Sequence, residues 1–193
     1  MRSIFTAYVL LITSSSIAQQ TNPEPLRSLF KLEGGGTMHQ FMLAYEQPVN
    51  SQWTIDLRVG LGYDFFLEVN PANPEGNIRL WWFDGVAAFT KAELRRYYNR
   101  KKWAEQGKSV SRNAGHYVAL STGYAHGLAS SPDFPLNGAM LTEIQWGAQW
   151  QDREWENWLS ACRLGLGYAS KDSYLRGSLY PVLDLALIHY LRR

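Results

Sequence analysis

The stretches WTIDLRVGLGY (residues 53–63) and WLSACRLGLGY (residues 158–168) nearly repeat each other, and both alternate with a period of two. This period is typical of a β-strand with one apolar face and one polar or small face. Each stretch has Trp at its start and Tyr at its end, both on the apolar face. At roughly 3.3 Å per residue and a tilt near 45°, this separation rises about 23 Å. The apolar band of an outer-membrane barrel is about 25 Å tall and has aromatic residues at both edges. The spacing therefore predicts strands that cross a bilayer.

Six further segments show a similar alternation, and together with the repeat they make eight, an even number, as single-chain bacterial barrels require. They are residues 26–34, 38–47, 82–98, 117–127, 139–151 and 179–191. We therefore predict an all-β fold: an eight-stranded, antiparallel, up-and-down transmembrane β-barrel. The repeat then forms the third and seventh strands, which run in the same direction on opposite walls.

The connections between the predicted strands alternate in length. Those at 48–52 and 152–157 are short, whereas those at 64–79 and 128–138 are longer and rich in Pro, Asn, Gly and Ser. Short turns belong on the periplasmic side and longer loops outside. The exception is residues 99–114, which are long and basic but fall on the periplasmic side. We expect them to extend the adjoining strands as a protruding hairpin.

The start of the chain resembles a secretory signal. Arg2 supplies the positive charge, residues 4–12 the apolar run, and Ser16-Ile17-Ala18 a small-residue cleavage site. We expect residues 1–18 to be a signal peptide, residues 19–193 to be one domain, and the mature protein to lie in the bacterial outer membrane. The formal net charge of +2 gives no electrostatic case for a nucleic-acid partner, and the single Cys162 excludes an intramolecular disulfide.

Charged residues recur on the polar faces of the predicted strands. An eight-stranded barrel has room inside only for its own side chains, and buried charges must be paired. We therefore expect a filled lumen with a balanced charge network and no pore. The predicted network comprises Asp56, Arg58, Lys91, Glu93, Arg95, Glu143, Arg163 and Asp184. The glycines at 60, 62, 165 and 167 would leave room for Arg and Tyr side chains from facing strands.

A second charged group forms the predicted basic hairpin, with Arg96, Arg100, Lys101, Lys102, Lys108 and Arg112. One interpretation is a solvated turn. The alternative is attraction to anionic lipid headgroups or to another anionic component of the envelope. The outer loops at 70–77 (NPANPEGN) and 130–137 (SSPDFPLN) are the other candidate contact regions, because loops on rigid scaffolds often carry function.

The sequence offers little basis for enzymatic chemistry. The four His residues show no zinc-binding spacing. His116 and Ser121 could suggest a hydrolase pair, but five residues apart on one strand they point to opposite faces. Cys162 falls on the apolar face in mid-strand. We therefore predict no enzyme, no cofactor and no metal site.

Four motifs add a resemblance to a known family. They are LAYE at residues 43–46, VGLGYDFF at 59–66, KAELRRYYNRKK at 91–102 and GKSVSRNAGHYVALSTGY at 107–124. In this order they resemble small outer-membrane β-barrel proteins of the Bacteroidota type. The resemblance covers most of the mature chain and implies its fold and location, not a chemical activity.

The predicted function is thus an outer-membrane barrel, expected to be a monomer in contact with membrane lipid. It would have a structural, adhesive or recognition role, acting through its loops or the basic hairpin. One alternative is a soluble secreted barrel of the lipocalin type that binds an apolar ligand, because alternation does not say which face is inside. A second alternative is a membrane-embedded lipid-modifying enzyme. The aromatic strand ends and the small or charge-balanced polar faces favour the first.

Overall fold

The computed structural model describes residues 23–35, 40–69, 78–129, 138–151, 155–170 and 178–191. The predicted signal peptide and the loops at 70–77 and 130–137 lie outside these ranges.

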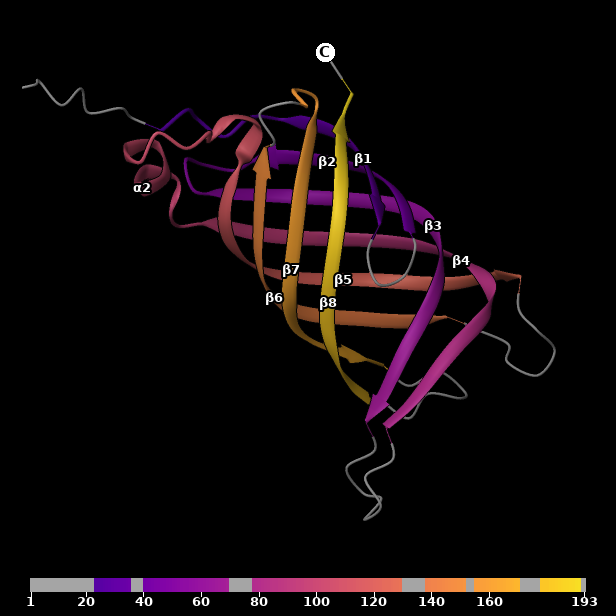
Figure 1. Ribbon diagram of the computed structural model, residues 1–193. Coiled ribbons are helices and arrows are strands. Elements are labelled where there is room, and N and C mark those ends of the chain that lie inside the picture. Colours follow the sequence, from indigo (N-terminus) through magenta and orange to yellow (C-terminus); the bar gives the residue numbers. More distant parts are fainter. Residues whose placement is uncertain are drawn as a thin grey trace, which may run out of the picture.

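Eight antiparallel strands form a closed barrel in the order of the sequence (Figure 1). Strand β1 closes the barrel by pairing with β8, from Lys31 opposite Tyr190 to Gly35 opposite Ala186. The predicted number, order and direction of the strands are confirmed. The strands are β1 (Leu29–Gly35), β2 (Gln40–Pro48), β3 (Trp53–Val69), β4 (Ile78–Tyr97), β5 (Gly115–Ala129), β6 (Ala139–Gln151), β7 (Trp158–Ala169) and β8 (Ser178–Tyr190).

The two repeat segments lie in β3 and β7, which are four strands apart in the closed ring, as predicted. The β3–β4 connection is shorter than predicted. Beyond a register shift between Tyr63 and Phe65, the two strands continue to pair until Val69 meets Ile78. Residues 64–69 and 78–79 are therefore strand, not loop, and the pair extends past the rest of the wall (Figure 1).

Alternation along the strands places most large apolar side chains outside and mainly charged, small or tyrosine side chains inside, although Met42, Phe89, Leu159 and Ile188 are also buried. On β2, Phe41 is 71% exposed, whereas its neighbour Met42 is 5% exposed. On β3, Leu57 is 51% exposed between Asp56 and Arg58, which are 0% and 4% exposed. This is the reverse of a water-soluble protein, in which large apolar side chains are usually the buried ones.

The basic connection at 99–114 is not the predicted protruding hairpin. It contains a short helix, α2 (Arg100–Glu105), and a 3-10 turn, η1 (Ser111–Asn113), at one end of the barrel (Figure 1). Arg, Lys, Ala and Glu are good helix formers, and Gly107, with φ of +68°, takes the left-handed conformation that commonly follows the end of a helix, here α2. None of the helices in the described ranges has the length and apolar composition that crossing a membrane requires.

Candidate functional site: an interior ion network and a closed barrel end

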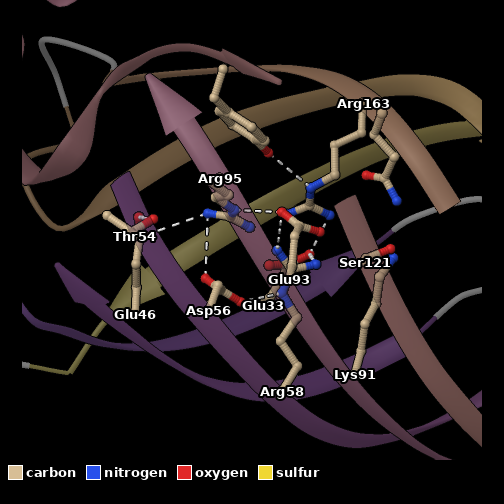
Figure 2. Close-up of polar contacts among 12 residues, drawn as sticks. Glu33, Glu46, Thr54, Asp56, Arg58, Lys91, Glu93, Arg95, Ser121 and Arg163 are labelled. Atoms are coloured by element: carbon tan, nitrogen blue, oxygen red, sulfur yellow. Dashed lines mark hydrogen bonds and ion pairs between the residues drawn. The ribbon is translucent and has the colours of Figure 1, made fainter. Parts of the chain in front are cut away.

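Charged side chains from the first four strands meet inside the barrel (Figure 2). Lys31 on β1 donates a hydrogen bond of 2.8 Å to Glu46 on β2 and another to Asp56 on β3. Arg95 on β4 lies 3.3 Å from Asp56 and 3.5 Å from Glu46, and pairs with Glu93 on its own strand. All five side chains are at most 1% exposed. Each carboxylate therefore faces at least one cation in a site without bulk water.

The two arginines shared by the sequence repeat converge on one carboxylate. Arg58 on β3 lies 3.6 Å from Glu33 Oε1, and Arg163 on β7 lies 2.6 Å from the same atom. Arg163 also pairs with Asp184 on β8, and Arg58 donates to Asp56 at 2.6 Å. Glu33 on β1 thus links the two walls that carry the repeat.

A third group surrounds Glu143 on β6, which is 7% exposed. This carboxylate pairs with Lys91 on β4 and accepts hydrogen bonds from Ser121 at 2.9 Å and from the Tyr180 hydroxyl at 2.8 Å. Gln145 donates to it as well. Strands β4, β5, β6 and β8 are therefore tied together at one acidic side chain.

All eight residues of the predicted charge network take part in these ion pairs. The sequence reasoning missed three more, Lys31, Glu33 and Glu46, which lie on the two N-terminal strands. A signal was available, since Lys31 and Glu33 alternate with the outward Phe30 and Leu32. Five of the pairs join strands two apart around the ring, which adjacent-strand register does not reveal. The full set is five cations (Lys31, Arg58, Lys91, Arg95, Arg163) and six carboxylates (Glu33, Glu46, Asp56, Glu93, Glu143, Asp184).

The network leaves a few polar atoms without a protein partner. Among the described residues these include Glu33 Oε2, Glu93 Oε2, Arg95 Nη2 and Arg163 Nη2. A cavity of about 80 Å³ lies beside the network, with Glu33 in its lining. Because a water molecule needs roughly 10–15 Å³, the cavity has room for water beside Glu33.

The glycine prediction holds in part. A Cβ on Gly167 would lie 2.2 Å from the Tyr180 ring, so this glycine does make room for a tyrosine. A Cβ on Gly165 would instead lie 2.1 Å from the backbone carbonyl oxygen of Ile144 on the neighbouring strand. Here the absent side chain permits close approach of two strands. Gly147, which the sequence reasoning did not single out, makes the same room for the Tyr117 ring.

The barrel end next to α2 is closed by residues 99–114, which we call the closing segment, and by the chain before β1. Asn113, fully buried, accepts a hydrogen bond of 2.8 Å from the Arg27 backbone N–H and donates one of 2.9 Å to the Arg27 carbonyl. Gln149 on β6 donates to the Asn113 carbonyl at 2.6 Å, and the Tyr190 hydroxyl on β8 donates to the Arg112 carbonyl at 3.0 Å. The closing segment is therefore bonded to the N-terminal segment and to two strands.

The closing segment also has an internal fastening. Arg100 is 6% exposed and donates to the Val110 carbonyl at 2.6 Å and to the Ala114 carbonyl at 3.3 Å. Burial lowers the pKa of its guanidinium from the ordinary value. Arg112 and Asn113 have positive φ values of 51° and 61°, a conformation that non-glycine residues adopt only when their surroundings impose it.

The six residues of the predicted basic hairpin divide into two groups. Arg100 is buried, and the Arg112 guanidinium stacks on the Tyr190 ring, 5.3 Å from its centroid, so both serve the closure of the barrel. The other four, Arg96, Lys101, Lys102 and Lys108, are exposed.

The residues considered for enzymatic chemistry are kept apart. His116 packs outside the wall against Trp103 and Trp146, with ring centroids 4.8 and 5.3 Å away, while Ser121 lies inside at Glu143. Within the described ranges, no group of His, Cys, Asp and Glu side chains is suited to hold a metal ion. Cys162 is a half-buried free thiol on β7.

Comparison of the chain with protein-family models, with curated proteins and with solved structures gave no match in any of the three.

Proposed function

We propose that this chain is an outer-membrane β-barrel protein with a filled, non-conducting lumen, and that it acts through its surfaces in a structural, adhesive or recognition role. The observation that carries the proposal is the inverted burial of the barrel: charges inside and large apolar side chains outside. The proposal agrees with the resemblance to small Bacteroidota-type outer-membrane barrels.

The outer wall supports the membrane part of the proposal. Exposed leucine, isoleucine, valine or phenylalanine side chains occur on every strand of the barrel. Examples are Phe41, Leu57, Leu120, Ile144 and Leu183, which are 51–71% exposed. Contiguous apolar patches on soluble monomers rarely exceed a few hundred Å². A bilayer would cover such a wall. Each Å² of apolar surface removed from water would stabilise the inserted barrel by about 25 cal/mol.

The interior supports the non-conducting part. The ion pairs join neighbouring strands and strands two apart around the ring, and the closing segment covers one end. Separating the partners of a buried ion pair leaves an uncompensated buried charge, which lowers stability strongly. We therefore expect these side chains to remain paired inside the barrel. An open water-filled pore would require the network to part.

The two alternatives find less support. A lipocalin-like protein needs an apolar interior for its ligand, whereas the inward positions here include Lys31, Glu46 and Arg95, all fully buried. A lipid-modifying enzyme needs a nucleophile and a base in contact, whereas His116 and Ser121 lie on opposite sides of the wall.

The test combines location, folding and conductance. The protein should stay in the outer-membrane fraction after washing with salt and carbonate, and should migrate faster on a gel before heating than after it. In planar bilayers the folded barrel should give no channel currents. Release by carbonate without heat-dependent migration would exclude the membrane proposal, and reproducible currents would exclude the filled lumen.

A further inference from the structure

We infer that the exposed cations around the closing segment form a binding surface for anionic phospholipid headgroups, on one side of the barrel only. We call this surface, formed by Arg96, Lys101, Lys102 and Lys108, the basic face. The inference rests on the proposed function, because it requires the barrel wall to lie in a bilayer.

Helix α2 lies where the apolar wall ends. Trp103 on α2 contacts the outward ring of His116, with centroids 4.8 Å apart. Two residues further along β5, on the same face, Val118 is 45% exposed, and Leu120 after it is 57% exposed. The lysines of α2 are therefore placed at the edge of the apolar band, where headgroups would lie if the band spans the hydrocarbon layer.

Aromatic side chains mark the same level. Trp146 on β6 donates a hydrogen bond of 2.6 Å from Nε1 to the hydroxyl of Tyr98, the residue directly after β4. Trp and Tyr are enriched at membrane–water interfaces because their rings are apolar and their tips polar. Lys108 Nζ lies 5.3 Å from the centroid of Trp103, so a cation and an interfacial ring already stand together.

The basic face carries four exposed cations. Arg96 on β4 extends the basic face along the wall, with its guanidinium 5.8 Å from the ring centroid of Trp53. The only acidic residue of α2 is Glu105, which is exposed. The neighbouring turn at the same end, residues 49–52, has no charged residue. Phosphate-bearing headgroups fit such a surface because long lysine side chains can reach them while the stems remain against apolar surface.

The test measures lipid preference with the full protein refolded in phosphatidylcholine bilayers. Trace amounts of spin-labelled phosphatidylglycerol and spin-labelled phosphatidylcholine report which lipid the barrel immobilises more strongly. We expect the wild type to prefer phosphatidylglycerol at low salt. Replacing Lys101, Lys102 and Lys108 with Gln should weaken this preference by on the order of fivefold per lysine that reaches a headgroup, and high salt should do the same.

Two matched controls lie at the same barrel end. Glu105→Gln removes the opposing charge and should strengthen the preference, whereas Arg27→Gln removes an exposed cation that pairs with Glu24 outside the basic face and should leave it unchanged. A wild-type barrel without the preference, or a triple variant that keeps it, would overturn the inference. So would tighter, lysine-dependent binding of soluble polyglutamate than of phosphatidylglycerol vesicles, which would indicate an acidic soluble partner.

If the proposed membrane location were wrong, the lipid experiment would give a different result from the one that contradicts the basic face alone. A chain that does not insert would immobilise neither lipid and would show no heat-dependent migration. A chain that inserts but lacks lipid preference would contradict only the inference about the basic face.

Discussion

Replacing Leu57 with Arg would test whether the outer wall faces lipid. Leu57 lies on the outward face of β3 and is 51% exposed. It is four residues from Trp53. At roughly 3.3 Å per residue and a 45° tilt, that separation is about 9 Å along the membrane normal. Because half of the apolar band is about 12 Å, Leu57 should lie close to the midplane of the bilayer.

The expected loss in the free energy of unfolding follows from the depth of Leu57 in the bilayer. An arginine near the midplane of a barrel wall costs about 2–4 kcal/mol, whereas a surface substitution facing water usually changes stability by about 0.5 kcal/mol or less. Val49 provides the matched control, because it is 57% exposed but lies in the turn between β2 and β3. Val49→Arg should therefore change the free energy of unfolding by only about 0–1 kcal/mol in the same bilayer.

The assay is reversible urea unfolding in phosphatidylcholine vesicles, followed by tryptophan fluorescence and by heat-dependent gel migration. With a urea dependence near 2 kcal/mol per M, Leu57→Arg should lower the midpoint by roughly 1–2 M. Leu57→Ala separates the effect of the charge from the loss of apolar area. Equal, small shifts for Leu57→Arg and Val49→Arg would show that both positions face water, and would refute the membrane placement of the wall.

The remaining predictions concern the interior and the closed end. Arg163→Met should lower the free energy of unfolding by about 3–5 kcal/mol, because it leaves Glu33 poorly paired. Adding Glu33→Leu should restore at least half of that loss. If the losses of the two single variants simply add in the double variant, Arg163 and Glu33 are not coupled. Gly165→Ala should lower the urea midpoint more than Gly167→Ala, because its Cβ would meet a backbone oxygen at 2.1 Å rather than a movable tyrosine ring; the opposite order would contradict this. Arg100→Met should speed chymotrypsin cleavage of the closing segment about tenfold through the loss of a buried hydrogen bond, with Arg100→Lys intermediate; an unchanged rate would mean that Arg100 does not fasten it.

Strand alternation allowed much of the fold to be predicted. The period of two in residues 53–63 and 158–168 identified both the strands and their inward residues, because the pleat sends successive side chains to opposite faces. The same rule placed Arg58 and Arg163 inside. It performed less well on β1, which is short, and so Lys31 and Glu33 were not recognised as members of the charge network.

Other features depend on contacts between distant parts of the chain. The closing segment was expected to be a hairpin, but Asn113 finds its partners in the backbone of Arg27 and in Gln149. None of these partners is near it in the sequence, so no local pattern could indicate the closure. Arg100 finds its carbonyl partners, Val110 and Ala114, within the closing segment itself, but in the sequence it is one of several cations and no local pattern marks it as the buried one.

The sequence by itself determined the architecture: eight alternating segments, apolar on one face and charged or small on the other, close into a barrel because period-two patterning is a local property of the chain. Only the tertiary structure decided which charges meet. Arg58 and Arg163 come from opposite walls and reach the same oxygen of Glu33 because ring closure brings β1 between them. The tertiary structure also decided which cations stay exposed, since the burial of Arg100 and the packing of Arg112 against the Tyr190 ring depend on how the closing segment folds onto the barrel. Pairing across the lumen and closure at one end are set by three-dimensional approach, which sequence spacing does not encode.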